Sequence, residues 1–290
     1  MGKRKSSEQG QIRNAILKGS LKKSLSLPPT GIVGLDGKVI ERPIKRLPKL
    51  DKEEKILDIY APCSWPFVYR KFMVNFCRII HPKMMVPLRK FGITDYFWDI
   101  NSKFPVCKNR NTAVLKARKY NADYMMFIDA DMQHPPDIVY RLAKHELPIV
   151  SGMYFHQAPP HLPVCYRHKE AHNYVHCWDY PKDKLFEVDL IGMGCVLVDM
   201  RVFDDIDMPY FKYDSSREDG IVDVTEDVEF CKKVRAAGYN IMVDPSVQCT
   251  HINIDDVAQT HFEAYMEQYQ TYTALMEKFG DGTISNISDE

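Results

Sequence analysis

The chain has 290 residues, of which 45% are hydrophobic and 27% charged, and its formal net charge is zero. This composition fits one large α/β domain with a proper core and argues against disorder over most of the length. No apolar run approaches the roughly 20 residues that cross a bilayer, and the basic N-terminal region lacks the apolar stretch of a secretory signal. We therefore expect a cytoplasmic protein with no membrane span.

Charge is distributed unevenly along the chain. Residues 1–50 contain twelve Lys/Arg and three Asp/Glu, a charge of +9, so the other 240 residues sum to −9. This asymmetry predicts a basic, partly ordered N-terminal arm on an acidic domain. The arm either packs on its own domain or a sister subunit, or binds nucleic acid or another polyanion. The eight cysteines are scattered without a C-x-x-C pair, which favours reduced core thiols.

From about residue 54 onward, apolar strands and helices alternate. Strands are expected at 56–61, 124–128, 149–155, 188–191, 195–198 and 241–243, and helices at 110–120, from Pro135, at 225–237 and at 257–279. The unbroken apolar run at 124–128 is typical of a strand covered on both faces. The alternation predicts an α/β domain over residues 51–254, with a mainly parallel sheet and helices on both faces. Residues 255–290 are expected to form a C-terminal helix and tail.

Two carboxylates, Asp129 and Asp131, follow the strand at 124–128 directly. Ligands of α/β folds bind at the carboxyl ends of strands, where two carboxylates separated by Ala130 can converge on one hard cation. A D-x-D triplet alone is a weak signal, and the alternative is capping of the next helix. Placing two carboxylates at the end of an apolar strand is unfavourable unless a cation or donor compensates.

Two further features lie later in the chain. Glu226 and Asp227 begin the expected helix at 225–237, where acidic residues suit a helix N-terminus whether or not they have a function. A carboxylate there can also act as a general base. His251 follows the last expected strand; a lone histidine is usually structural, but the D-x-D pair leaves room for a third metal ligand.

In this order, the motifs resemble the GT-A glycosyltransferases, in particular their family-2-like members. The matching text is RNTAVLKARKYNADYMMFIDADMQHPPDI at 110–138, VDLIGMGCVLVDMRVF at 188–203 and VTEDVEFCKKVRAAGYNIMVDPSVQCTHI at 224–252. The resemblance spans about residues 55–252 and implies a Rossmann-like fold and transfer of one sugar from a nucleotide-diphosphate donor, most often a UDP-sugar.

The resemblance also implies roles for single residues. Asp131 and His251, with Asp129 behind them or on the ribose, are expected to hold Mn²⁺ or Mg²⁺. Asp227 is the expected base of an inverting displacement, and Glu226 orients the base or the acceptor. The remaining donor-binding positions are Pro62, Cys63, Arg110, Ala130, Gly192 and Gly194, the two glycines allowing close approach of the backbone to the sugar or acceptor.

Two alternatives remain. A sugar-nucleotide nucleotidyltransferase uses a related sheet but needs a Gly-rich phosphate loop near its first strand, and residues 61–69 contain no glycine. A non-catalytic nucleotide-sugar or nucleic-acid binding protein is the other. The His-rich segment at 156–178 is expected to be an irregular loop over the site rather than a zinc-binding helix, with Tyr154 and Trp178 available for stacking.

Overall fold

The computed structural model describes residues 43–63, 68–101, 105–170, 173–213, 225–252, 262–263 and 266–267, and the backbone of two short strands, β1 (Ile32–Val33) and β2 (Val39–Ile40). Most of the expected N-terminal arm and of the expected helix at 257–279 lies outside these residues; positions 262–263 and 266–267 are helical. The inner end of the arm contacts the domain: the Lys45 amide donates to Asn240 Oδ1 over 2.8 Å, and Arg201 Nη1 donates to the Pro48 carbonyl over 2.7 Å.

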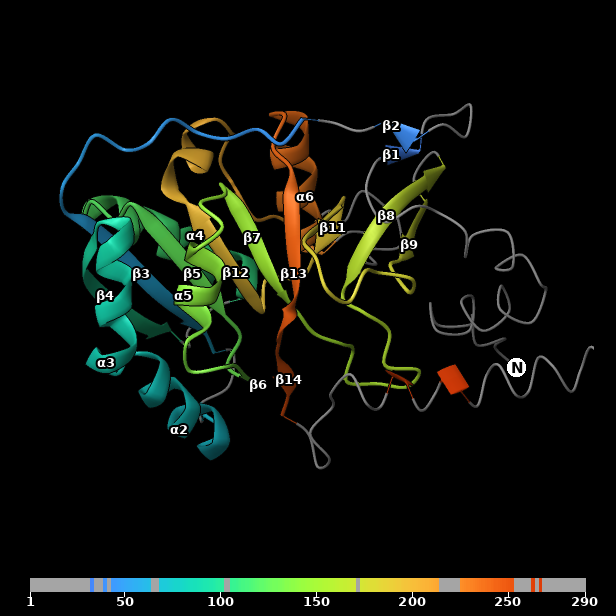
Figure 1. Cartoon of the computed structure of the whole chain (residues 1–290), viewed down its shortest axis with the longest axis horizontal. Coiled ribbons are helices and arrows are strands. Elements are labelled where there is room, and N and C mark those ends of the chain that lie inside the picture. The colour runs from blue at the N-terminus through green and yellow to red at the C-terminus, as the bar shows by residue number, and fades with distance from the viewer. Residues whose placement is uncertain are drawn as a thin grey trace, which may run out of the picture.

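A seven-stranded sheet forms the centre of the protein (Figure 1). Its strands are β3 (Lys55–Pro62), β4 (Ile93–Asn101), β5 (Tyr124–Ile128), β7 (Ile149–Met153), β10 (Phe186–Val188), β12 (Cys195–Asp199) and β13 (Ile241–Gln248), in the order β10-β13-β7-β12-β5-β3-β4. Strands β4, β3, β5, β7 and β13 share one direction, because β12 runs antiparallel to both β5 and β7. The predicted mainly parallel sheet is confirmed, with β12 and β10 as its two reversed strands.

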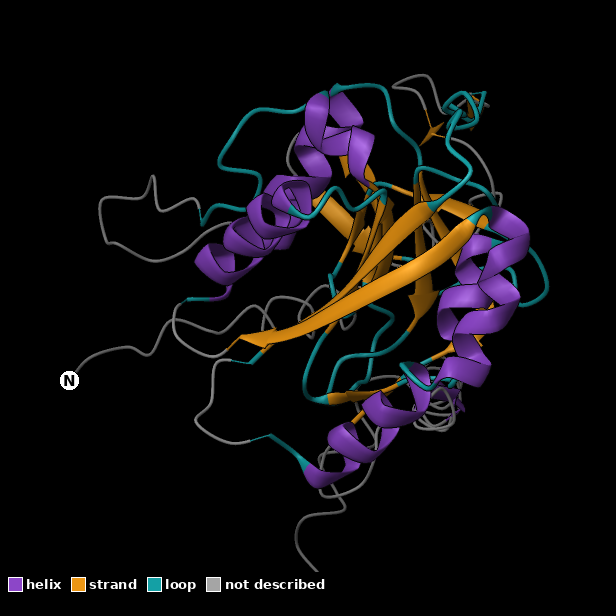
Figure 2. Ribbon diagram, turned by 90° about the vertical axis from the view of Figure 1, so that its left-hand side faces the viewer, coloured by secondary structure: helices purple, strands orange, loops and turns teal. Residues whose placement is uncertain are grey.

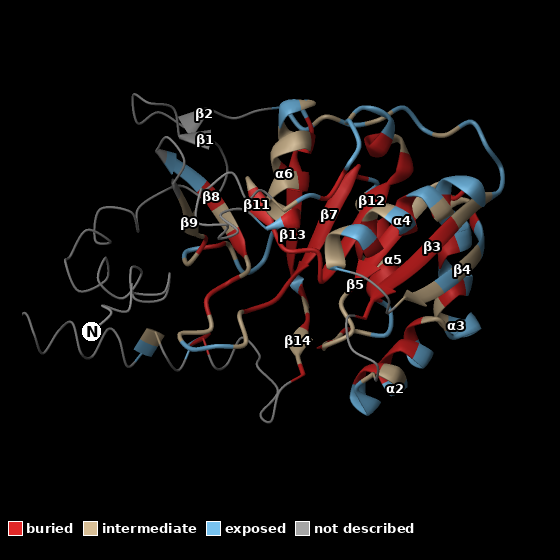
Figure 3. Cartoon of the chain, turned by 180° about the vertical axis from the view of Figure 1, so that it is seen from behind, coloured by how far each residue is buried: buried red, intermediate tan, exposed pale blue. Residues whose placement is uncertain are grey.

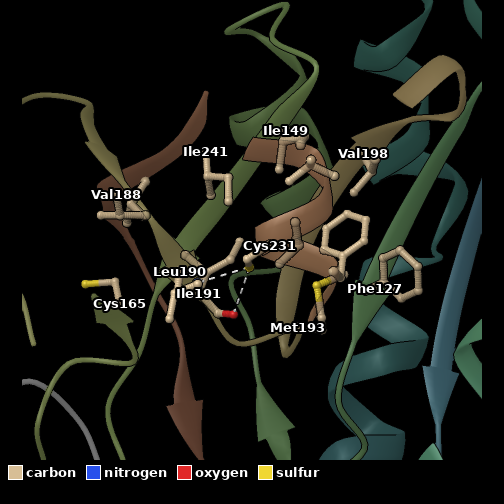
Figure 4. Close-up of a cluster of buried hydrophobic side chains, with 14 of the residues drawn as sticks. Phe127, Ile149, Cys165, Val188, Leu190, Ile191, Met193, Val198, Cys231 and Ile241 are labelled. Atoms are coloured by element: carbon tan, nitrogen blue, oxygen red, sulfur yellow. Dashed lines mark hydrogen bonds between the residues drawn. The ribbon is translucent and has the colours of Figure 1, made fainter. Parts of the chain in front are cut away.

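Helices cover both faces of the sheet, as predicted (Figure 2). On one face lie α4 (Val106–Lys119) and α6 (Glu226–Ala236), whose buried side chains share a core with β7, β10, β12 and β13. Figure 4 shows the part of this core around Cys231 of α6. On the other face lie α2 (Arg70–Ile79) and α5 (Ile138–Ala143), whose buried side chains share a second core. Helix α5 packs on β7, β12 and β13, and α2 packs beside the short strand that follows β5. Three short elements complete the layers: α3 (Pro82–Met85) and the 3₁₀ helices η1 (Val86–Phe91) and η2 (Met200–Asp204). In the described part of the chain, no helix is long and apolar enough to span a membrane.

Besides the β1–β2 pair, two smaller sheets accompany the main one in the described part of the chain, and the first lies beyond the carboxyl ends of β5 and β13 (Figure 1). Strand β6 (Met132–Gln133) pairs antiparallel with β14 (Thr250–His251), placing Met132 opposite His251. A second sheet contains β11 (Leu190–Ile191), β8 (Cys165–Glu170) and β9 (Asn173–His176). The β6–β14 pairing brings together segments about 120 residues apart in sequence.

Several predicted elements differ from the structure. The irregular loop expected across the His-rich segment is wrong, because β8 and β9 form a hairpin with Tyr166 opposite His176. The single strand expected at 188–191 is divided between β10 and β11, which belong to different sheets. Helix α2 and strand β4 are not among the elements predicted from the sequence. For β4, β8, β10 and β11, pairing with neighbouring strands decides a structure that local periodicity leaves open.

Candidate functional site

Arg110 lies at the centre of the candidate site. Its side chain is only 4% exposed, and its Nη2 donates to Asp129 Oδ1 over 2.9 Å while its Nη1 donates to Glu226 Oε1. Burial acts to lower the pKa of Arg110, but the carboxylates of Asp129, Glu226 and Asp227 outweigh it and hold that pKa above its ordinary value. The guanidinium therefore stays charged and joins β5 to the start of α6.

The two acidic residues that begin α6 have different environments. Glu226 is buried on Arg110; burial raises its pKa, while the charge of Arg110 counters that effect. Asp227 is partly exposed, and its Oδ1 accepts hydrogen bonds from Thr225 Oγ1 and, over 2.9 Å, from the Val228 amide. The Thr225 side chain makes no capping hydrogen bond. The structure thus places Glu226 in the ion-pair network and leaves Asp227 accessible.

Asp131 and His251 are brought together by the β6–β14 pair. The Asp131 carbonyl accepts from the Ile252 amide over 2.7 Å, and Gln157 Nε2 approaches Asp131 Oδ2 at 3.4 Å. Burial raises the pKa of Asp131, the charge of Asp129 raises it further, and His251 lowers it. His251 Nδ1 lies 2.5 Å from the Phe155 carbonyl. As the donor of this bond, Nδ1 leaves the Nε2 lone pair for a ligand, the arrangement usual in metal-binding histidines.

The donor atoms suit a hard divalent cation, although they are not all gathered around one point. Carboxylate oxygens and an imidazole nitrogen fit Mn²⁺ or Mg²⁺, and two neighbouring carboxylates with a raised Asp131 pKa need a compensating positive charge. Among the described residues, the three side chains with ligand atoms within 4.8 Å of one another are instead His134, Cys195 and Cys249. Of the three expected metal ligands, Asp129 is engaged in an ion pair with Arg110.

The two core thiols have a structural explanation. Cys249 and Cys195 are buried with their sulfurs 3.4 Å apart in an S–H···S contact. Burial raises the pKa of Cys249 well above its ordinary value, so the thiol stays protonated, the form that binds metals poorly. Together with the buried Cys165 and Cys231, this supports the expectation of reduced core cysteines.

Gly192 and Gly194 are required by the chain's own side chains. A Cβ on Gly192 would lie 2.2 Å from the Tyr154 hydroxyl, and a Cβ on Gly194 would lie 2.5 Å from Met132 Sδ and 3.1 Å from Asp129 Oδ2. The Gly194 amide donates to the Tyr154 hydroxyl over 3.2 Å. Tyr154, expected to stack on a ligand, is instead buried beside these glycines with its ring edge-on to His251.

His134 and Asn75 position the segment after the D-x-D motif, and the sequence analysis missed both. His134 is buried, and its Nε2 lies 2.8 Å from the Gly194 carbonyl, which also accepts from the Asp129 amide over 3.2 Å. The Asn75 amide accepts from the His134 N–H over 2.8 Å and donates to the His134 carbonyl over 2.7 Å. Asn75 stands in an apolar stretch and His134 in a polar one before two prolines, so no local signal marks either residue.

The expected donor-base residues lie at the adjoining edge of the sheet. Pro62 ends β3 opposite Asn101, and the buried Cys63 donates its amide to the Asn101 carbonyl over 2.8 Å. Two residues earlier, the buried Tyr60 hydroxyl has no hydrogen-bond partner among the described residues. Burial raises the pKa of Tyr60, and the positive charge of Arg110 partly offsets that rise. The charge of Arg110, which pairs with Asp129 after β5, therefore also acts on Tyr60 of β3.

Comparisons with known proteins give structural likeness alone. No family model matches the chain, and no curated protein matches it either. A solved protein from STIV is 16% identical, with a TM-score of 0.47 over 71% of this chain and 91% of that one. GalNAc-T7 with UDP, GalNAc and Mn²⁺ is 10% identical, with a TM-score of 0.44 over 88% of this chain and 58% of that one.

A UDP-glucose pyrophosphorylase complexed with UDP-glucose is 8% identical, with a TM-score of 0.38 over 74% of this chain and 99% of that one. These neighbours thus include a glycosyltransferase and a nucleotidyltransferase. At such identities and TM-scores, these likenesses concern the fold and not the reaction.

Proposed function

We propose that the protein is a metal-dependent glycosyltransferase that moves a single sugar from a nucleotide-diphosphate donor, with a UDP-sugar as the first candidate. The observation that carries this proposal is the convergence of charged groups at one end of the sheet. Arg110 binds both Asp129 and Glu226, and Asp131 lies beside the strand pair that holds His251. A nucleoside diphosphate needs such a combination of fixed cations and metal-binding carboxylates.

The accessible carboxylate of Asp227 is the proposed base, which takes the proton from the acceptor hydroxyl. The neighbouring Glu226 is buried on Arg110 and is proposed to hold that guanidinium in place. Thr225 and the Val228 amide both donate to Asp227 Oδ1, which fixes the carboxylate and leaves Oδ2 for the acceptor. The second proposed task of Arg110 is to offset the charge of the donor diphosphate.

Asp131 and His251, with Asp129 behind them, are the residues proposed to hold Mn²⁺ or Mg²⁺. When bound, the cation neutralises charge on the departing nucleoside diphosphate. The Phe155 carbonyl orients the His251 ring, and Gln157 approaches the Asp131 carboxylate. The donor base is proposed to lie at Pro62 and Cys63, next to the end of β4.

A nucleotidyltransferase is the competing enzyme, and a non-catalytic binding protein is the other rival. The lack of glycine across residues 61–69 disfavours the nucleotidyltransferase, because its phosphate loop brings the backbone close to the triphosphate. The accessible Asp227 beside the diphosphate-binding groups disfavours a simple binder, since binding alone does not need a base.

The test is release of nucleoside diphosphate. The full chain is incubated with Mn²⁺ and UDP-, GDP-, ADP- or TDP-sugars, and the released nucleotide is measured for the wild type and Asp131→Asn. We expect slow hydrolysis of one donor and a loss of about 10²-fold or more in the variant, because an aligned metal contributes several kcal/mol. Asp137→Asn, an exposed aspartate six positions later, is the matched control and should retain full rate.

Three results would contradict the proposal. Equal release by the wild type and Asp131→Asn would remove the carboxylate from the chemistry. Conversion of a nucleotide-sugar and pyrophosphate into a nucleoside triphosphate would identify a nucleotidyltransferase. Tight donor binding with no release, in the presence of simple alcohol and sugar acceptors, would identify a binding protein.

A further inference from the structure

The segment that forms α2, α3 and η1 carries basic side chains and no acidic one. No acidic residue occurs in the sequence between Asp58 and Asp95, whereas six basic residues do: Arg70, Lys71, Arg78, Lys83, Arg89 and Lys90. All six are exposed. Beyond the +9 arm, the chain is acidic overall, so this local excess of positive charge is an exception that calls for an anionic partner.

The same surface carries exposed apolar side chains. An open groove of about 650 Å³ lies between α2 and α3, with Met73, Val74, Met84 and Pro136 in its lining, and Arg78 and Lys83 line it as well. Val74 is 46% exposed and Val86, at the start of η1, is 57% exposed. Figure 3 shows the exposed outer sides of α2 and α3, which project from the lower edge of the domain. Exposed apolar side chains next to cationic ones are typical of a surface that binds an amphiphilic partner.

Helix α2 is also joined rigidly to the candidate site. Its inner face is buried through Phe72, Phe76 and Ile79. From the same helix, Asn75 makes both of its hydrogen bonds, of 2.7 and 2.8 Å, to the backbone of His134, three residues after Asp131. Whatever binds the outer face of α2 therefore lies next to the segment that carries the D-x-D motif.

We propose that the face formed by α2, α3 and η1 docks on an anionic lipid surface, with its cations on lipid phosphates and Val74, Val86 and the groove lining among the upper acyl chains. Charge complementarity alone would suit a nucleic acid equally well. The aliphatic and methionine lining decides against that partner, because nucleic acids are held by polar and aromatic groups. This docking goes beyond the proposed sugar transfer and does not depend on it.

The experiment is co-sedimentation of the full chain with vesicles of phosphatidylcholine alone or with 30% phosphatidylserine added. We expect binding to the anionic vesicles only. The double variant Arg78→Glu with Lys83→Glu should bind at least about 25-fold more weakly, since each Lys/Arg near an anionic surface contributes about fivefold. The double variant Val74→Ser with Val86→Ser should bind about threefold to tenfold more weakly, because it removes only apolar insertion.

The matched control reverses two exposed lysines elsewhere, Lys119→Glu with Lys184→Glu, and changes net charge equally. It should bind vesicles like the wild type, apart from a small general effect of net charge. The basic N-terminal arm is present in every variant. If the two charge-reversal variants lose vesicle binding equally, or if neither loses any, the arm rather than the α2–α3–η1 face is responsible and the proposal is overturned. Loss on charge reversal with no loss in the Val74/Val86 variant, together with displacement by duplex DNA, would overturn it in favour of a nucleic-acid surface. Unchanged thermal melting of each variant shows that folding is intact.

Discussion

A single buried cation holds together three parts of the candidate site. Arg110 comes from α4, whereas its partners Asp129 and Glu226 come from the end of β5 and the start of α6, 19 and 116 residues later in sequence. Burying a guanidinium costs several kcal/mol unless its hydrogen bonds are satisfied. The two carboxylates satisfy Nη1 and Nη2, whereas the buried Nε has no hydrogen-bond partner among the described residues.

Replacing Arg110 with Gln should therefore destabilise the protein by about 3–5 kcal/mol, because it leaves the buried Glu226 and the partly exposed Asp129 without their shared cation. Urea unfolding measures the loss. Arg110→Lys should recover little of it, since one ammonium does not bridge two carboxylates as a planar guanidinium does. The control is Arg118→Gln on the same helix, whose exposed pair with Asp204 at 2.8 Å should cost less than about 1 kcal/mol. Equal costs at the two positions would disprove the central role of Arg110.

At the scale of elements, the segment between β11 and β12 crosses closely over the end of β7. Tyr154 follows β7 directly, and its hydroxyl accepts from the Gly194 amide and occupies the space that a Cβ on Gly192 would need. The glycines are thus fitted to a tyrosine of this chain. That packing positions Gly194, whose carbonyl accepts from both Asp129 and His134.

A double-mutant cycle tests this contact. Gly192→Ala should cost about 1–3 kcal/mol through overpacking, and Tyr154→Phe about 1–2 kcal/mol through the orphaned Gly194 amide. Combined, they should cost at least about 1 kcal/mol less than their sum, because Tyr154→Phe removes the clashing oxygen. Gly194→Ala is the comparison: its nearest clash, 2.5 Å, is with Met132 Sδ, so Tyr154→Phe should relieve little. Equal relief at both glycines in thermal or urea unfolding would contradict the packing we describe.

At the scale of the whole molecule, buried histidines make the folded state sensitive to acid. Burial lowers the pKa of His134 to about 4, against the opposing effects of its bond to Gly194 and the charge of Asp129. Burial also lowers the pKa of His156 to about 4, aided by His176 and His251. Above about pH 6.5 these rings are neutral both folded and unfolded. As the pH falls from about 6.5 to 4, the unfolded chain takes up the protons first and stability declines.

His134 alone should account for about 3 kcal/mol of that decline, at 1.36 kcal/mol for each pH unit between the two pKa values. His134→Gln keeps an amide donor for the Gly194 carbonyl but cannot titrate. Its unfolding free energy, measured in urea at pH 7, 6, 5 and 4, should therefore fall less steeply than that of the wild type. His168→Gln, an exposed position on β8, should leave the slope unchanged. Parallel curves for all three proteins would rule out His134 as a source of acid sensitivity.

The sequence by itself determined the features that depend on local chemistry. Alternating apolar runs and helices predicted the α/β sheet with helices on both faces, and the apolar run before Asp129 placed the acidic pair at the end of a buried strand. Periodicity and strand ends suffice for these features because hydrophobic burial and backbone geometry act over a few residues. The roles of Asp131, His251 and Asp227 in catalysis stay predictions.

Only the tertiary structure decided which side chains meet. The link of Arg110 to Glu226, the clamp of Asn75 on His134 and the fit of Tyr154 to Gly192 each join segments 38 to 116 residues apart. The β8–β9 hairpin in place of a loop arises in the same way, because β8 also pairs with β11. Such contacts depend on sheet order and on packing between layers, and the local hydrophobic pattern of a sequence determines neither.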